Sequence, residues 1–418
     1  MKLVNKYLKK EPKVPHYVAL DIGTEFVKAL IFKIEGDKGV VVGAGRQRQR
    51  LGDMHGGAVT DIAGVVENCS RALDRAEEMA GVVADECIIG IAGELVKGTT
   101  TTVHYERLKH TSKIDYNELK NIVNKVQWKA FDAARKQLAW ETGYNTIDVK
   151  LVNASIVDVK IDGYKVTNPI GFQGKDVSIG IFNAFAPMVH LGALQTIAAD
   201  LGLDLISIAA EPYAVARSVG VDEAGEFSGI FIDIGGGTSD IAVVRNGGLE
   251  GTKMFAIGGR SFTKRLTQVL GVSFAKAEEI KLAYANNMLE EKSEKTVREA
   301  LELDAEVWLS GVELSLSEFS DVDLLPSKIL LCGGGAALPE IKKALESDGW
   351  YKNLPFAKKP KISFIKPAEV SNMVDQTSEI KDQQDVTPLG LGSLVVDMDV
   401  EDDVMPSVLQ KVVKMMQN

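Results

Sequence analysis

Apolar residues in this chain gather into short runs that end at polar or glycine-rich turns. Two runs are similar: Val18–Thr24 reads Val-Ala-Leu-Asp-Ile-Gly-Thr, and Ile230–Thr238 reads Ile-Phe-Ile-Asp-Ile-Gly-Gly-Gly-Thr. Each predicts a buried strand that stops at an aspartate and turns on glycine into a second strand. Because each copy opens an apolar-rich half of the chain, the pair predicts a duplicated fold with a ligand held between its halves.

Helical and strand periodicities elsewhere alternate along the chain, which predicts an α/β fold. Asp61–Ala80 has apolar residues at near-helical spacing, and Glu86–Ile91 is a short apolar run typical of a buried strand. Further helices are predicted at Met188–Leu201, Ser261–Leu270, Ala275–Met288, Thr296–Leu309 and after Pro339. Further strands are predicted at Val177–Phe185, Leu203–Ala210 and Lys328–Cys332.

The segment 97–177 has the pattern of a separate small unit, with strands around one helix. The helix is predicted to open at Asp115, and Glu118 stands where a capping box places its second residue. Two alternating segments, Ile147–Val152 and Ile156–Ile161, predict strands that lead into a turn at Asp162-Gly163.

The two ends of the chain differ in character from the rest. Residues 1–16 form a basic N-terminal tail, and residues 397–404 an acidic linker ahead of an amphipathic helix at 405–418. The apolar face of that helix consists of Val408, Leu409, Val412, Val413 and Met416. A basic amphipathic helix on a flexible linker is typical of a reversible membrane-surface anchor. The same pattern also fits a helix that docks on its own domain or on a partner.

Composition narrows the function classes. The 418 residues suffice for two to four domains, and 45% hydrophobic with 25% charged residues is ordinary for a globular protein. The net charge of −10 argues against sequence-wide nucleic-acid binding, which usually needs a basic patch. Three cysteines without disulfide spacing and five histidines without metal-ligand spacing indicate reduced thiols in the cytosol and no structural zinc site. No apolar run reaches the ~18–20 residues that span a bilayer.

The two glycine turns carry the strongest candidate chemistry. Phosphate groups need backbone N–H donors at close approach, which glycine allows because it has no Cβ. The candidate phosphate-binding residues are Gly23 and Thr24 in the first copy and Gly235, Gly236, Gly237 and Thr238 in the second. Asp21 and Asp233, at the strand ends, could hold Mg²⁺ through its waters. A single copy fits an ordinary β-hairpin with Asp at its turn, whereas the pair favours a nucleotide clamp.

Three further positions add to this candidate site. Glu211, before Pro212 at a strand end, could polarise a water molecule, although a plain strand-to-helix turn fits as well. Gly333, Gly334 and Gly335 lie between a strand and a helix, where backbone can approach a ligand. Glu278 and Lys281 share one helix face and could bracket a ribose or base; a solvated charged pair is the alternative.

Together these residues resemble the superfamily of actin, heat-shock chaperone and sugar-kinase ATPases. Asp21–Lys28 looks like its first phosphate loop, Asp233–Asp240 like its second, Ala209–Ala216 like its connecting segment and Leu331–Leu338 like its adenosine motif. The resemblance implies two ribonuclease-H-like domains around a nucleotide cleft that binds ATP and Mg²⁺. It places Asp21, Glu211 and Asp233 in catalytic positions and Lys28 among the nucleotide-binding residues.

Within that superfamily, the insertion at 97–177 and the sequence Phe255–Arg260 resemble the bacterial cell-division family FtsA and its relatives of the PilM type. The resemblance implies an actin-like fold with a small α+β subdomain, called 1C or SHS2-type, at 97–177. It assigns subdomain 1A to 17–96 and 178–221, subdomain 2A to 222–260 and 326–396, and subdomain 2B to 261–325. The polar segment Asp222–Gly225 is the predicted hinge.

FtsA-like function implies a cytoplasmic protein, peripheral at the inner face of the membrane, that forms filaments and tethers an FtsZ-like tubulin homologue. Slow or regulatory ATP turnover fits the resemblance. The C-terminal segment departs from the family because it has no aromatic residue. Two alternatives stay open: a PilM-like assembly platform for pili or secretion, and a small-molecule kinase on the same fold.

Overall fold

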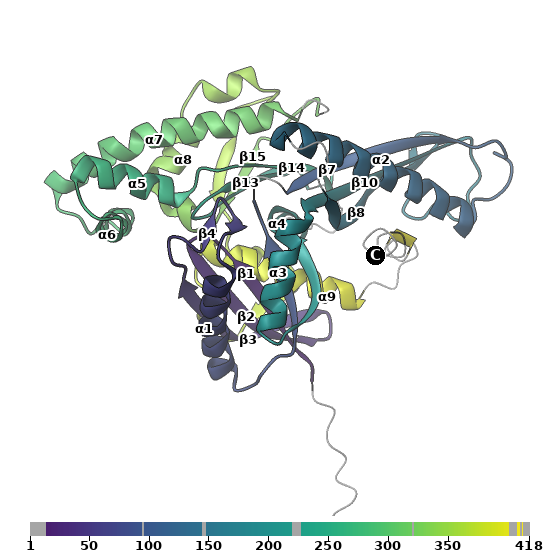
Figure 1. The fold of residues 1–418 in the computed structure, drawn as a ribbon. Helices are drawn as coiled ribbons and strands as arrows, with labels where there is room; N and C mark the ends of the chain where they lie inside the picture. Colours follow the sequence, from purple (N-terminus) through teal and green to yellow (C-terminus); the bar gives the residue numbers. More distant parts are fainter. Residues whose placement is uncertain are drawn as a thin grey trace, which may run out of the picture.

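The first lobe is built on a mixed six-stranded sheet (Figure 1). The computed structural model describes residues 14–93, 96–143, 148–219, 227–319, 322–400, 408–409 and 412. The sheet has the order β11-β6-β1-β2-β3-β17. Its strands are β1 (His16–Ile22), β2 (Phe26–Glu35), β3 (Lys38–Arg48), β6 (Glu86–Ile91), β11 (Asp204–Ala210) and β17 (Met373–Asp375). Two short strands, β4 (Met54–His55) and β5 (Ala58–Val59), form a separate hairpin.

Helix α1 (Ile62–Ala80) packs closely on β3 because two glycines of that strand give it room. A Cβ on Gly43 would lie 2.1 Å from the carbonyl oxygen of Ala76, and one on Gly45 would lie 1.8 Å from that of Ala72. The helix begins and ends where the sequence predicts: Asp61 caps its first turn and Gly81 ends it in the left-handed conformation. Helix α3 (Met188–Asp200) also belongs to this lobe.

The second lobe repeats the pattern with β12 (Gly229–Ile234) and β13 (Ser239–Arg245), followed by β14 (Gly248–Phe255), β15 (Lys328–Cys332) and β16 (Lys361–Phe364). Its helices are α5 (Gly259–Leu270), α6 (Phe274–Ala285), α7 (Glu291–Ser317) and α8 (Pro339–Glu346). Short 3-10 turns lie at η1 (Gly334–Ala337), η2 (Trp350–Asn353), η3 (Pro367–Glu369) and η4 (Gln383–Asp385). Ile230, Ile232 and Ile234 alternate towards the core formed with the helices, while Phe231 faces the other side.

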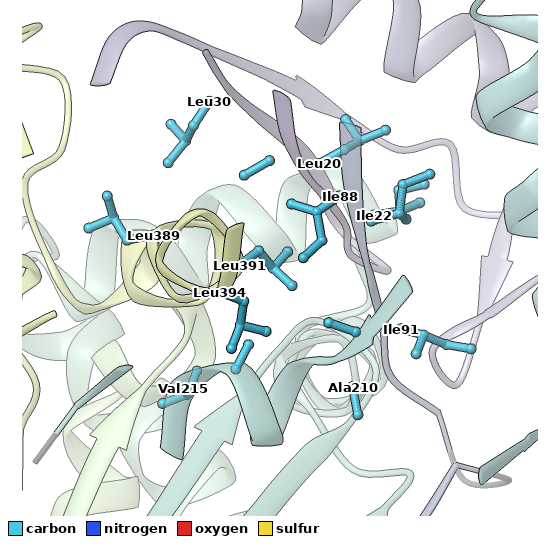
Figure 2. Packing of buried hydrophobic residues seen from close by; sticks show 14 of the residues in the cluster. Leu20, Ile22, Leu30, Ile88, Ile91, Ala210, Val215, Leu389, Leu391 and Leu394 are labelled. Atoms are coloured by element: carbon cyan, nitrogen blue, oxygen red, sulfur yellow. The ribbon is translucent and has the colours of Figure 1, made fainter. Parts of the chain in front are cut away.

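Two helices, α4 (Glu211–Ser218) and α9 (Val386–Val400), pack in the core that joins the two lobes. Figure 2 shows Leu389, Leu391 and Leu394 of α9 beside Leu20 and Ile88 of the first sheet. Residues 373–375 and 386–396, predicted within the second lobe, therefore pack with the first. The first four residues of the predicted acidic linker, 397–400, are helical.

The inserted subdomain, predicted at 97–177, contains β7 (Lys97–Glu106), α2 (Tyr116–Thr142), β8 (Val149–Ile161) and β9 (Tyr164–Lys165). Its last strand, β10 (Asp176–Pro187), begins just before the predicted boundary and continues beyond it. The two strand segments predicted at 147–152 and 156–161 form one strand, because β8 continues through Asn153–Ser155. Its pairing with β10 contains two register shifts, typical of β-bulges. The predicted turn at Asp162-Gly163 is present, with both residues at positive φ.

A strand pairing joins the inserted subdomain to the second lobe. Gly251 and Thr252 of β14 pair with Thr99 and Gly98 of β7, so the second sheet continues into the subdomain as nine strands. Within the subdomain, Asp115 caps α2 as predicted, accepting a hydrogen bond from the Glu118 N–H at 2.8 Å. The Glu118 carboxylate instead pairs with the buried guanidinium of Arg107 through two 2.8 Å contacts.

No helix within the described residues is long and apolar enough to cross a membrane. The predicted hinge at Asp222–Gly225 and most of the predicted N-terminal tail lie outside the described residues, as do Val413 and Met416.

Candidate functional site

A row of charged residues crosses the first sheet at the tip of its first hairpin. Asp21 on β1 stands opposite Lys28 on β2, and Lys28 stands opposite Arg46 on β3. Because opposed residues on neighbouring strands share a face of the sheet, the three side chains point the same way. The Lys28 ammonium contacts the Asp21 carboxylate at 3.1 Å and donates to the Gln384 carbonyl oxygen at 2.5 Å.

The second sheet has a matching row. Asp233 on β12 stands opposite Asp240 on β13 and opposite Cys332 on β15. The Thr238 hydroxyl donates to the Asp240 carboxylate at 2.9 Å, and the Thr387 hydroxyl donates to Asp233. Each lobe therefore presents one polar row, and the residues of both rows other than Cys332 line a single cleft.

The two glycine turns are alike in their backbone bonds and meet across the cleft. The Gly23 N–H donates to the Phe26 carbonyl at 3.1 Å, and the Gly235 N–H donates to the Thr238 carbonyl at 2.9 Å. A Cβ on Gly236 would lie 2.6 Å from the Glu25 side chain, and one on Gly237 would lie 2.7 Å from the Thr24 hydroxyl. Side chains at these two positions would hold the lobes apart.

Three carboxyl groups of the cleft have pKa values above the ordinary range. Burial raises the pKa of Glu211 well above its usual value, and the nearby carboxylates of Asp21, Asp240 and Asp233 add to the effect. Burial also raises the pKa of Asp233, while the hydrogen bond from Thr387 opposes it. For Asp240, burial and the charge of Asp233 raise the pKa to about 7.

The Lys28 ammonium lies among these acids and stays charged. Burial lowers the pKa of Lys28, but the carboxylates of Asp21 and Asp233 outweigh that effect and the net pKa is raised. The cluster thus combines the Lys28 cation with carboxyl groups whose pKa values are raised, which suits a site that binds an anion and activates water.

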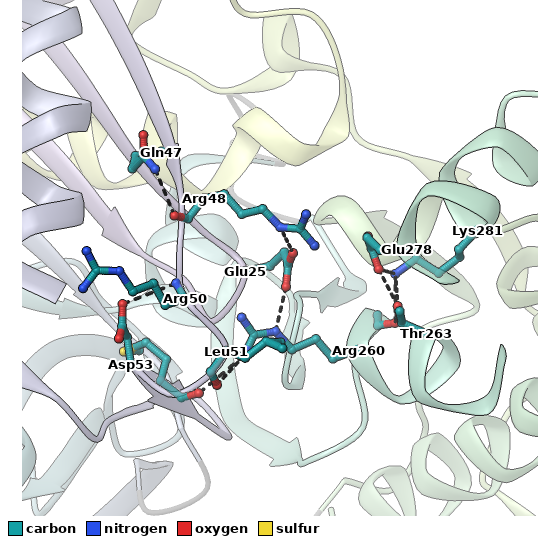
Figure 3. Close-up of polar contacts among 12 residues, drawn as sticks. Glu25, Gln47, Arg48, Arg50, Leu51, Asp53, Arg260, Thr263, Glu278 and Lys281 are labelled. Carbon is teal, nitrogen blue, oxygen red and sulfur yellow. Dashed lines mark hydrogen bonds and ion pairs between the residues drawn. The ribbon is translucent and has the colours of Figure 1, made fainter. Parts of the chain in front are cut away.

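Glu278 and Lys281 lie on α6 and form a buried pair facing the same cleft, rather than the solvated pair that was the alternative (Figure 3). The Lys281 ammonium contacts the Glu278 carboxylate at 2.8 Å and donates to the Thr263 hydroxyl at 2.8 Å. It also donates to the Gly259 carbonyl oxygen at 2.9 Å. The apolar lining beside the pair consists of Leu282, Ala285, Ala337 and Leu338.

Glu25 links the two lobes across the mouth of the cleft. Its carboxylate contacts Arg48 of the first lobe at 2.7 Å and Arg260 of the second at 2.6 Å (Figure 3). Arg260 lies in the first turn of α5, and the N-terminus of this helix contacts the second glycine turn because the Arg260 N–H donates to the Gly236 carbonyl at 2.8 Å.

The cleft offers unused donors to an anion. Arg46 Nε and Arg260 Nη2 are buried and have no hydrogen-bond partner among the described residues, and both side chains line the cleft. Buried guanidinium donors are costly to leave unpaired, and phosphate oxygens suit their geometry. The cleft encloses about 1150 Å³, including the open solvent at its mouth. These features fit a nucleotide with its phosphates between the glycine turns.

Nearly all the predicted site residues lie around this one cleft. The lining includes Asp21, Gly23, Thr24, Lys28, Glu211, Asp233, Gly235, Gly236, Thr238, Glu278, Lys281, Gly333, Gly334 and Gly335. Gly237 lies beside it, against Thr24. Among the described residues, no group of three or more His, Cys, Asp or Glu side chains is arranged to hold a metal ion. A Mg²⁺ ion held by Asp21 and Asp233 through water stays a prediction.

Several residues of the cleft were not predicted from the sequence. Strand register places Arg46 in the cleft, and Glu25 contacts the other lobe. Gln384 and Thr387 reach the cleft from a distant part of the sequence. Only the alternation Gly45-Arg46-Gln47-Arg48 on a glycine-rich strand offers a sequence signal, because it puts Arg46 and Arg48 on one face.

Comparison with known proteins gives consistent results. The family model described as "Cell division protein FtsA" matches residues 230–384. The FtsA protein of Pseudomonas aeruginosa is 25% identical over 338 residues, which are 76% of this chain and 77% of that protein. The FtsA protein of Bacillus subtilis is 24% identical over 344 residues, or 78% of this chain and 74% of that one.

Similar solved structures confirm the predicted actin-like α/β fold. A "PilM-PilN type IV pilus biogenesis complex" chain has a TM-score of 0.63 at 16% identity, covering 92% of this chain and 99% of its own. The ethanolamine utilization protein EutJ from Carboxydothermus hydrogenoformans has a TM-score of 0.50 at 16% identity, covering 92% and 90%. At such identities the likeness establishes the fold alone.

Proposed function

We propose that this chain, an actin-like relative of the FtsA cell-division proteins, binds ATP between its lobes and polymerises as a cytoplasmic membrane adaptor for an FtsZ-like tubulin homologue. The proposal that the chain binds ATP rests on the cleft between the lobes. Two glycine turns with the same backbone bond, a charged row behind each, and two buried arginine nitrogens without a hydrogen-bond partner among the described residues converge on one space.

The roles of the cleft residues follow from their positions. The N–H groups of the glycine turns and Thr24 and Thr238 would surround the phosphates, with Lys28 and Arg46 supplying positive charge behind them. Glu278 and Lys281 would contact the ribose, and Gly333–Gly335 with the apolar lining would receive the base. Mg²⁺, when bound, would neutralise phosphate charge, and Asp21 and Asp233 would orient its waters.

ATP hydrolysis would depend on the protonation state of Glu211. Burial and the carboxylates of Asp21, Asp240 and Asp233 raise the pKa of Glu211, which favours its protonated form. Only the deprotonated carboxylate can accept a proton from water, so Glu211 would act as a base when a bound cation offsets the neighbouring negative charges. Such a base fits slow or regulatory turnover.

Nucleotide binding is tested at Gly334. A Cβ there meets nothing within 4 Å, so a leucine can enter the cleft without displacing the protein's own atoms. We expect Gly334→Leu to weaken ATP binding roughly a hundredfold (~2.8 kcal/mol) while the protein stays folded. The matched control is Gly192→Leu on α3, which also meets nothing within 4 Å and lies away from the cleft lining. Fluorescence titration with an ATP analogue measures both; equal affinities for the two variants would refute the assignment.

Membrane attachment and partner binding are tested with the full chain. Pelleting with phospholipid vesicles and ATP should require the apolar face of the C-terminal segment, and pelleting with FtsZ polymers should not. Failure of either assay removes that part of the proposal and leaves the nucleotide site standing.

A second candidate function is supported by the burial of Val408, Leu409 and Val412 in the structure. A C-terminal segment held against the protein suits a PilM-like assembly platform that works without filaments. A monomer in electron microscopy at saturating ATP, together with a dispensable C-terminal segment, would favour this candidate.

A further inference from the structure

The C-terminal segment contacts the inserted subdomain at the three of its residues that the structure describes. Val408, Leu409 and Val412 are 0%, 4% and 0% exposed. They belong to the same buried cluster as α2, β8 and β10, and not to the core of either lobe. Figure 1 shows the described part of this segment next to the inserted subdomain. Three of the five residues predicted to meet lipid are thus covered by protein.

The receiving surface is one face of the subdomain sheet. Val177 and Ile179 of β10 stand opposite Ile161 and Val159 of β8, and all four are buried in the cluster. The intervening positions on the other face, including Lys160, are polar. Val408, Leu409 and Val412 belong to the same cluster as the buried side chains of α2, so the C-terminal segment and α2 cover this face together.

The C-terminal segment is suited to that face by its spacing. Val408, Leu409 and Val412 are helical, and Val412 follows the other two by four and three residues, a spacing that places all three on one apolar stripe of a helix. The face that enters the subdomain cluster is therefore the face predicted to enter a membrane. A side chain buried in one of these environments cannot occupy the other at the same time.

The tether favours docking within one molecule. Helix α9 ends at Val400, and Val408 follows eight residues later (408 − 400). Eight extended residues span at most about 29 Å. Joining a segment to its docking surface within one chain by so few residues gives an effective concentration on the order of millimolar, well above ordinary protein concentrations.

We propose that the apolar face formed by α2, β8 and β10 is a binding surface for the chain's own C-terminal segment, and that this docking competes with membrane attachment. The second half rests on the proposed function. On a membrane the segment leaves, and the face of the inserted subdomain is uncovered. Membrane attachment and exposure of this surface are then one event.

Docking is tested first by thiol accessibility in solution. The native cysteines Cys69, Cys87 and Cys332 are all buried, so an introduced thiol dominates the signal. Val412→Cys should react with a water-soluble maleimide at least tenfold more slowly than the control Gln410→Cys, which leaves all three described apolar positions intact. Equal rates would overturn docking. Protection of Val412→Cys that disappears on dilution would assign the contact to a second copy and overturn docking within one molecule.

Competition is tested by hydrogen exchange of the full chain with vesicles of phosphatidylcholine and phosphatidylglycerol. Amides of α2 and β8 should exchange at least tenfold faster when the protein is vesicle-bound, because their cover is lost. Val412→Asp should produce the same increase without vesicles, and Gln410→Asp should not. Vesicle-bound protein with unchanged protection would overturn the competition. Slow thiol labelling in a protein that never binds vesicles would retain docking and refute membrane attachment instead.

Discussion

Single side chains explain why this cleft suits a phosphate ligand. Asp21, Asp233 and the glycines next to them follow from the repeated motif, because strand ends and turn chemistry are local properties. Arg46 and Glu25 do not follow from it. Their roles depend on strand register and on a contact between lobes more than 200 residues apart in sequence, the Glu25–Arg260 pair. Predicting them would have required the three-dimensional pairing that a single sequence does not contain.

Asp240 makes a pH-dependent prediction. Its pKa is raised to about 7 by burial first and by Asp233 second, so the folded state holds a proton that the unfolded state has released above pH ~4. This group therefore costs stability as pH rises from about 4 to 7. Asp240→Asn removes that cost and can still accept the Thr238 hydroxyl.

Urea unfolding measures the effect. The stability of Asp240→Asn relative to the unsubstituted protein should increase by about 2 kcal/mol between pH 5 and pH 8. The control is Asp37→Asn, the same substitution at an exposed position outside the cleft. A relative stability of Asp240→Asn that falls with pH would contradict the assigned direction.

Helices and strands were predicted well where their patterns are local and less well where packing sets their limits. Helix α1 begins and ends at the predicted caps, whereas α7 extends from Glu291 to Ser317, well beyond the predicted 296–309. Strand β8 crosses Asn153–Ser155 because pairing with β10 compensates for weak strand residues. The partner of Glu118 also depended on packing, since Arg107 reaches it from the end of β7.

Arg107 tests how the inserted subdomain is held together. Arg107→Ala leaves Glu118 and the carbonyl oxygens of Ser112 and Gly174 without this partner. Removing one member of a fully buried ion pair typically costs ~3–5 kcal/mol. Because Glu118 is partly exposed, we expect a smaller loss of about 2 kcal/mol in the stability of the subdomain. The control is Arg135→Ala, whose pair with Asp132 is exposed and should contribute less than ~1 kcal/mol. Hydrogen exchange of the slowest α2 amides measures both, and equal effects would contradict this account.

At the scale of the whole molecule, the structure differs from the prediction in which segments pack on which lobe. The duplicated lobes and the insertion follow from the repeat and from the change of pattern at 97. The packing of β17 and α9 on the first lobe could not be predicted in this way, because the sequence of an apolar segment does not indicate which sheet it packs on. Nor could the pairing of β14 with β7, which extends one sheet from the second lobe into the inserted subdomain.

The most direct test of the account is negative-stain electron microscopy of the full chain on an anionic lipid monolayer. With ATP, we predict filaments attached to the lipid, and with Gly334→Leu or without nucleotide we predict none. Gly192→Leu should behave like the unsubstituted protein. Monomers on the lipid at saturating ATP, in a protein that binds ATP normally, would contradict a polymerising membrane adaptor.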